Sequence, residues 1–194
     1  MRDPERRDPE PPLTGDPDSW LDEVLPDILP PRPVSAEVGR VRLLEAVRSP
    51  ALRYAPFYDR LGALWDLPDP ALRAVFEGAA NARAWQRVWP GFRQLSVVGG
   101  PKLLGARARL MHFEPGFRFP SHRHRGAETL LVLEGSYSDE NQVRFGPGDL
   151  SEMAAGSAHE LVIGPDGPCV AAVAERGLEF TGPLLRLLGR WFSL

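Results

Sequence analysis

The sequence predicts a mainly β fold, a small antiparallel sandwich or barrel, with a helical segment before it and a short helix after it. Three observations predict this. Residues 83–180 hold short apolar or alternating runs separated by Gly, Pro and Asp. Residues 34–82 carry apolar side chains at helical spacing. In residues 181–194, Leu184, Leu188 and Trp191 fall on one helical face.

Composition narrows the protein class. A net charge of -3 over 194 residues argues against a nucleic-acid binder, which usually carries a dense basic surface. Cys169 is the single cysteine, so no intrachain disulfide forms, and its thiol is either oxidant-sensitive or an inert buried group. The charged start MRDPERRDPE does not resemble a signal peptide, and no apolar run approaches the roughly 20 residues of a membrane span. We therefore expect a soluble, cytoplasmic protein.

Residues 1–33 are rich in proline and acidic residues, and we expect them to be largely disordered. They contain one apolar island, SWLDEVLPDIL, at residues 19–29. It is either a docking segment that folds on a partner or a tail that packs on its own domain, and both interpretations stay open.

The helical segment, residues 34–82, divides into three expected helices. Ser35 can cap a first helix that Pro50 bounds. A second helix comes next over residues 52–67, with Pro56 in its first turn or breaking it. Asp69 and Pro70 open a third. Three short helices make little core alone, so we expect them to pack on the strand-rich region after them or on a partner.

Six runs between residues 92 and 175 have the pattern of strands: FRQLSVVGG, ARARLMHFE, ETLLVLEG, GDLSEM, HELVIG and CVAAVAE. The helix expected over 181–194 would seal the barrel or form a dimer contact. A membrane-surface helix is the alternative, although two arginines are few for anchoring.

Four side chains form a candidate metal site. In a strand, residues i and i+2 face one side, so His122 and His124 present their imidazoles together. Glu128 begins the next strand, and His159 begins a later one. Three imidazoles and a carboxylate suit a divalent transition metal, with zinc expected and iron, manganese or nickel as alternatives. The alternative is a pair of surface histidines on a loop.

The walls of the site follow from strand alternation. Leu130 and Val132 share the face of Glu128. We expect Arg107 and Arg109 to face outward, which turns Leu110 and His112 inward. His112 is then either a donor beside the metal site or a hydrogen-bonded core histidine, and Tyr137 either contacts a ligand at the mouth or packs. Arg123 and Arg125 alternate with the ligands and are expected to face solvent.

The run GFRFPSHRHRGAETLLVLEG, residues 116–135, resembles the first cupin motif, and GDLSEMAAGSAH, residues 148–159, resembles the second. The second motif departs from the usual pattern at Ala154 and Ile163, where proline and asparagine are usual. The resemblance covers about residues 84–180. It implies a jelly-roll β-barrel with a metal at His122, His124, Glu128 and His159. Because cupins are frequently dimers, it also implies a homodimer.

The segments HRHRGAETLLVLEGSYSDE, FGPGD, AAGSAHE and AAVAERG are similar to the cupin domains of ChrR-type anti-sigma factors, which respond to oxidative stress. That resemblance implies a sigma factor bound by an N-terminal helical domain that a His/Cys zinc site holds together. Residues 34–82 contain neither histidine nor cysteine, so that zinc site is absent here. Any sigma-factor contact within residues 1–82 must rely on helix packing.

Two functions are compatible with the same site. A regulator would use the open metal position to sense a small molecule or oxidant. A metalloenzyme, a dioxygenase or isomerase, would use it to polarise a substrate. A purely structural metal is a third interpretation. Because no acid–base pair stands out beyond the metal ligands, we favour regulation over catalysis.

Overall fold

A computed structural model describes residues 35–181, apart from the side chains of residues 45–48. The disordered tail predicted at 1–33 with its docking segment 19–29 falls outside the described residues, as does nearly all of the helix expected at 181–194. The chain divides into two compact units, residues 1–41 and 42–194. The second unit contains every described strand and most of the described helical turns.

The described part begins with helices. Ser35 caps α2, since its hydroxyl oxygen accepts a hydrogen bond from the backbone N–H of Val38 at 3.3 Å, as predicted. The second expected helix is broken at Pro56, which sits in a short 3₁₀ turn and separates two helices. The helices are α2 (Ala36–Arg48), α3 (Pro50–Arg53), α4 (Tyr58–Trp65) and α5 (Asp69–Ala79), with 3₁₀ turns at Ala55–Phe57, Ala82–Ala84 and Pro101–Leu103.

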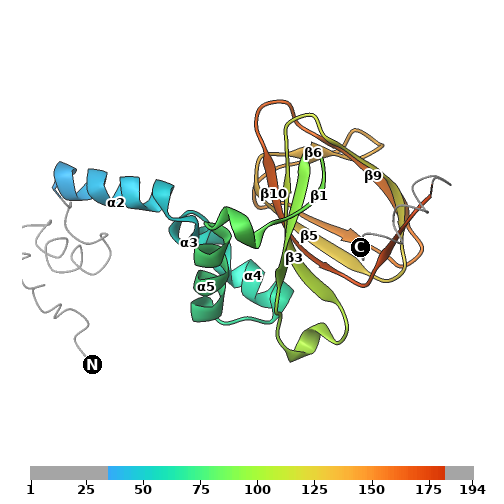
Figure 1. Ribbon diagram of the computed structural model, residues 1–194, viewed down its shortest axis with the longest axis horizontal. Coiled ribbons are helices and arrows are strands. Elements are labelled where there is room, and N and C mark those ends of the chain that lie inside the picture. The colour runs from blue at the N-terminus through green and yellow to red at the C-terminus, as the bar shows by residue number, and fades with distance from the viewer. Residues whose placement is uncertain (1–34, 182–194) are drawn as a thin grey trace, which may run out of the picture. The chain divides into compact units, whose positions relative to one another are not determined.

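Eleven strands form two antiparallel sheets in the described part of the chain (Figure 1). Along the chain they are β1 (Gln86–Trp89), β2 (Phe92–Val97), β3 (Arg107–Phe113), β4 (Arg118–His124), β5 (Glu128–Glu134), β6 (Tyr137–Ser138), β7 (Arg144–Phe145), β8 (Leu150–Met153), β9 (Ala158–Ile163), β10 (Cys169–Glu175) and β11 (Leu178–Phe180). The six-stranded sheet has the order β1-β2-β3-β10-β5-β8, and the five-stranded sheet has the order β11-β4-β9-β6-β7. All six predicted strand runs are strands, and the predicted mainly β, jelly-roll class is confirmed.

One hydrophobic core lies between the two sheets. It takes side chains from both, among them Phe92, Phe113 and Val132 of the larger sheet and Phe119 and Ile163 of the smaller. Burial of these side chains against one another is the main force that holds the sheets together. We call the space between the two sheets the interior.

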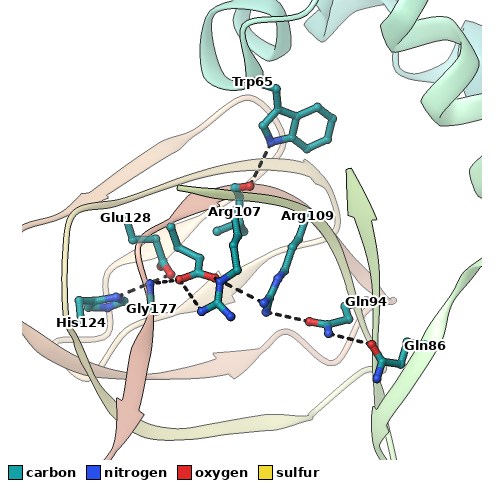
Figure 2. A network of polar contacts seen from close by, with 10 residues as sticks. Trp65, Gln86, Gln94, Arg107, Arg109, His124, Glu128 and Gly177 are labelled. Atoms are coloured by element: carbon teal, nitrogen blue, oxygen red, sulfur yellow. Dashed lines mark hydrogen bonds and ion pairs between the residues drawn. The ribbon is translucent and has the colours of Figure 1, made fainter. Parts of the chain in front are cut away.

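A second core joins the helices to the outer face of the six-stranded sheet. Trp65 and Phe76, from α4 and α5, are fully buried with Leu110 and Ala172 of the sheet. The indole N–H of Trp65 donates to the Val173 carbonyl of β10 at 3.0 Å, as Figure 2 shows. The Tyr54 hydroxyl donates to the Glu134 carboxylate at 2.8 Å. Helices α3, α4 and α5 therefore pack on the sheet that comes after them in the chain, which was one of the two predicted outcomes.

The register of β3 corrects the predicted orientation of its side chains. Arg109 and Met111 stand opposite Val173 and Ala171, on the interior face. Leu110 consequently faces the helices, and His112 lies on the same outer face. The prediction that Arg107 and Arg109 face outward is wrong, and so is the inward placement of Leu110 and His112.

Candidate metal centre

Three histidines meet in the interior. His122 and His124 lie on β4, and the register of β4 with β9 sets His159 directly opposite His122. All three side chains are at least 96% buried. The ring centroids are separated by 4.9 Å for His122 and His124, 4.5 Å for His122 and His159, and 4.9 Å for His124 and His159. The sequence prediction that these imidazoles converge is therefore confirmed as geometry.

A β-bulge in β4 makes this convergence possible. Phe119 pairs with Leu161 and His122 pairs with His159, so β4 has one residue more than β9 between these pairs. Without the extra residue, positions three apart would face opposite sides of the sheet. Pro120 occupies the irregular stretch, where its missing N–H costs no ladder hydrogen bond. The bulge lets both Phe119 and His122 face the interior.

The nitrogens of the triad are placed as metal donors would be. The Nδ1 atom of His122 lies 2.9 Å from the Pro120 carbonyl. Because a carbonyl can only accept, that contact needs the proton on Nδ1 and leaves Nε2 with its lone pair. This Nε2 atom lies 3.0 Å from Nε2 of His159. Such a lone pair, aimed at the other rings, is what a metal ion requires.

Buried nitrogens without partners support the same interpretation. Both ring nitrogens of His124 and the Nδ1 atom of His159 are buried with no hydrogen-bond partner among the described residues. Burial of an unpaired polar group costs free energy, so we expect these nitrogens to bind a partner such as a metal ion. One donor atom from each histidine lies within 4.8 Å of the other two. Metal–nitrogen bonds of about 2.0–2.1 Å would bring such atoms to roughly 3 Å apart, a small side-chain adjustment. The donor set fits a divalent metal.

Burial also keeps the triad neutral. It lowers the pKa of His122 to about 3 and that of His124 to about 4, and it lowers the pKa of His159 as well. The neighbouring imidazoles contribute in the same direction for His122 and His124. Neutral imidazoles bind metals, so the site is ready for a cation at physiological pH.

Glu128 approaches the triad from the facing sheet. It is the first residue of β5, is buried, and places Oε2 3.6 Å from Nδ1 of His124 (Figure 2). The structure thus brings the carboxylate to His124 without including it in the three-nitrogen group. Burial, followed by the Glu175 carboxylate, raises the pKa of Glu128 to about 8, and Arg109 opposes this. Its role as fourth ligand remains a proposal.

A buried charged network lies beside Glu128, and sequence reasoning missed it. Glu175 stands opposite Glu128 in the register of β10 with β5 and is 1% exposed. Its carboxylate lies 2.7 Å from Nε of Arg107 and 3.7 Å from Nη2 of Arg109, and it accepts a hydrogen bond from the Gly177 backbone. Nη1 of Arg109 donates to Gln94 at 3.0 Å, which in turn contacts Gln86 (Figure 2).

This network shows why the arginines can face inward. A buried charge is tolerated only when it is paired and hydrogen-bonded. Glu175 pairs with both guanidinium groups and accepts a hydrogen bond from Arg107, and Gln94 accepts one from Arg109. The available signal was the alternation in CVAAVAE, which puts Glu175 on the same face as Cys169, Ala171 and Val173. An inward glutamate predicts an inward cation on the neighbouring strand.

The remaining candidate residues divide between the two faces. Leu130 and Val132 line the interior as predicted. Tyr137 is buried in the interior core and stacks on Phe145 at 4.9 Å, and burial raises its pKa to about 12. His112, on the outer face, contacts Arg93 and Trp85 instead of the triad.

Comparison with known proteins agrees with this geometry. A family model described as "ChrR Cupin-like domain" matches residues 77–179. The anti-sigma-E factor ChrR of Cereibacter sphaeroides is 34% identical over 112 residues, which are 57% of this chain and 50% of that protein. The chain therefore matches about half the length of this curated relative.

Two solved structures are among those similar to this chain. The complex of Rhodobacter sphaeroides SigE with the anti-sigma ChrR covers 80% of this chain and 75% of its own, with 25% identity and a TM-score of 0.46. An acetylacetone dioxygenase from Acinetobacter johnsonii covers 58% of this chain and 88% of its own, with 13% identity and a TM-score of 0.46. With the triad, the two-sheet fold and a family match over more than half of its residues, the chain belongs to the ChrR cupin-like family.

Proposed function

We propose that this protein is a cytoplasmic, metal-binding regulator of the anti-sigma type. Its cupin domain, residues 83–180, binds a divalent transition metal, zinc first, and its N-terminal 82 residues bind a sigma factor. The observation that carries the proposal is the buried group His122, His124 and His159 inside a domain of the ChrR family. The homodimer that the resemblance implies is part of the proposal.

The four metal ligands in this proposal come from both sheets. His122 and His124 on β4 and His159 on β9 supply imidazoles from one sheet, and Glu128 on β5 supplies a carboxylate from the other. A bound divalent metal would supply a fixed positive charge and Lewis acidity at this point. The chain's own residues exclude water from the site and hold Glu128 beside Glu175 and the two inward arginines.

The proposed partner is suggested by the relative's name, anti-sigma-E factor, and by α2. On α2, Val38, Val41 and Leu44 recur at i, i+3 and i+6 and are each more than 40% exposed. An amphipathic helix with an exposed apolar stripe is suited to lie against an apolar groove of a partner protein. Since residues 1–82 hold no histidine or cysteine, this contact would rely on packing.

The interior beside the triad favours a regulator over the alternative metalloenzyme. The Phe119 ring lies 4.9 Å from the His122 ring, edge to face, and Phe180 lies 6.4 Å from it. These aromatic side chains pack against one side of the triad. A site enclosed in this way would favour a small oxidant or ligand over a larger substrate.

The test is co-purification of the tagged full-length chain from its native host, with any bound sigma factor identified by mass spectrometry. We expect a stable complex with the wild type. Val41→Asp combined with Leu44→Asp should abolish it, because two carboxylates would enter the apolar stripe. Gly39→Asp is the matched control: it lies on the opposite side of α2 from Val41, and a Cβ there meets nothing within 4 Å.

Retention of the sigma factor by the double variant, or no complex with the wild type, would refute the partner assignment. Both variants should keep the wild-type metal content, because α2 supplies no ligand. Metal analysis of the same preparations therefore separates failure of the partner assignment from failure of the metal site.

A further inference from the structure

A cavity outside the metal centre opens at the β1 edge of the six-stranded sheet. It measures about 520 Å³, within the usual range for small-ligand sites. Its lining includes Trp85, Arg87, Trp89, Arg93 and Glu114. No histidine of the triad lines it, and its residues come from β1, β2, the turn after β3 and the segment before β1.

Two indole rings form fixed walls of this cavity. The N–H of Trp85 donates to the Ala79 carbonyl at 2.8 Å, which sets the orientation of that ring. Trp89 packs against Phe92, Phe119 and Phe180, with centroid separations of 6.2, 5.9 and 5.1 Å. Both tryptophans are only half-buried, so their remaining ring surface faces the cavity. Rigid aromatic surface of this kind favours a flat, apolar ligand.

A charged side chain borders the same space. The guanidinium of Arg93 lies 5.9 Å above the Trp85 ring and contacts Nε2 of His112 at 3.2 Å. The Arg93 side chain is 42% exposed, so its outer N–H groups can donate to an acceptor in the cavity.

The charges around the cavity define the acceptor. Arg87 and Arg93 provide two positive charges, and Glu114, 3.8 Å from Arg93, provides one negative charge. Burial and then Arg93 lower the pKa of His112, so its imidazole is neutral near pH 7. The lining therefore carries one net positive charge, which complements a monoanion better than a phosphate dianion.

From the two indole rings in the lining, the exposed Arg93 guanidinium and the single net positive charge, we propose that this cavity binds a small aromatic carboxylate. The ring would lie against the exposed indole surface of the lining, and the carboxylate would accept hydrogen bonds from Arg93, with Arg87 at the rim. Arginine suits this task because its planar fork matches a carboxylate in two-point contact. The site acts independently of the metal centre.

The test is isothermal titration calorimetry on the full-length protein with benzoate as the probe and benzamide as its uncharged analogue. For a ligand of this size we expect a benzoate dissociation constant of about 0.1–1 mM. Benzamide should bind about tenfold more weakly, since it cannot accept a charge-assisted pair of hydrogen bonds. Arg93→Gln should weaken benzoate binding about tenfold, and Arg87→Gln by a smaller factor.

Two controls fix the location. Arg118→Gln removes an exposed arginine of β4 outside the cavity lining and should leave benzoate binding unchanged. Metal-free protein carrying His122→Asn and His159→Asn should bind benzoate as the wild type does. Equal binding of benzoate and benzamide, no loss in either cavity variant, no saturable binding up to about 10 mM, or loss on metal removal would each overturn the proposal. Thermal unfolding followed by circular dichroism checks that the variants fold.

Discussion

Acidification of the metal-free protein tests the buried triad and Glu128 together. Unfolded histidine titrates near 6.5, whereas burial lowers the pKa of His122 to about 3 and of His124 to about 4. The unfolded chain therefore binds protons first, and the free energy of unfolding falls as the pH drops below about 6.5. Between pH 7.5 and 5.0 each of these two histidines should remove about 2 kcal/mol of stability.

Glu128 acts in the opposite direction. Its pKa is raised from 4.5 to about 8, so the folded protein binds this proton before the unfolded chain does. Over the same interval the free energy of unfolding should rise by about 3 kcal/mol on account of Glu128. These three groups alone give the wild type a net loss of about 1 kcal/mol and Glu128→Gln a loss of about 4 kcal/mol. His159 and His112, whose pKa values are also lowered, add a further loss to both proteins, so the difference of about 3 kcal/mol between them is the predicted quantity.

The assay is urea denaturation of EDTA-treated protein at pH 7.5 and 5.0. Adding His122→Asn to Glu128→Gln should recover about 2 kcal/mol of the acid loss. The pKa of Asp66 is lowered mainly by hydrogen bonding to Lys102. Asp66 is present in every variant, so its contribution to the change in unfolding free energy cancels in the comparison. An acid loss in Glu128→Gln no larger than that of the wild type would refute the assigned environment of Glu128.

Three further predictions concern packing and reactivity. Trp65→Ala should lower the free energy of unfolding by about 3–5 kcal/mol, because the side chain is fully buried between α4 and the sheet, and Trp65→Phe should cost less; urea denaturation measures both. Native Cys169 should react with Ellman's reagent only on unfolding, since it is buried and burial raises its pKa to about 12; prompt reaction of the native protein would contradict this. Gly135→Ala should cost about 2 kcal/mol or more, because φ is +70° and a Cβ would lie 2.1 Å from the Pro168 carbonyl oxygen. Gly156→Ala, with φ +83° and no atom within 4 Å, should cost about 1 kcal/mol and serves as its control.

Two members of the triad could be predicted from sequence because the geometry of His122 and His124 is local. His122 and His124 need only strand alternation to face one side, and the cupin-like spacing then implicates His159. The bulge at Pro120 was not predicted, although a proline inside a strand is a recognised sign of one. The short strands β1, β6, β7 and β11 were also missed, because strands of two to four residues leave little periodicity to detect.

The interior arginines could not be placed from their own sequence. RARLMHF alternates in a way that allows either face to be buried, and charge favours the solvent assignment. Pairing with Glu175, a residue 68 positions from Arg107, decides the face. Register between distant strands depends on such long-range partners, which a local pattern does not contain. His112 was assigned to the wrong face for the same reason, because the predicted inward and outward alternation along β3 was shifted by one residue.

Metal content measured by mass spectrometry tests the central claim most directly. Full-length protein purified from its native host should carry about one divalent transition metal per chain. His122→Asn combined with His159→Asn should reduce this to background, and His112→Asn, which changes the outer-face histidine, should leave it intact. Full metal content in the double variant, or none in the wild type, would contradict a metal centre at the three histidines.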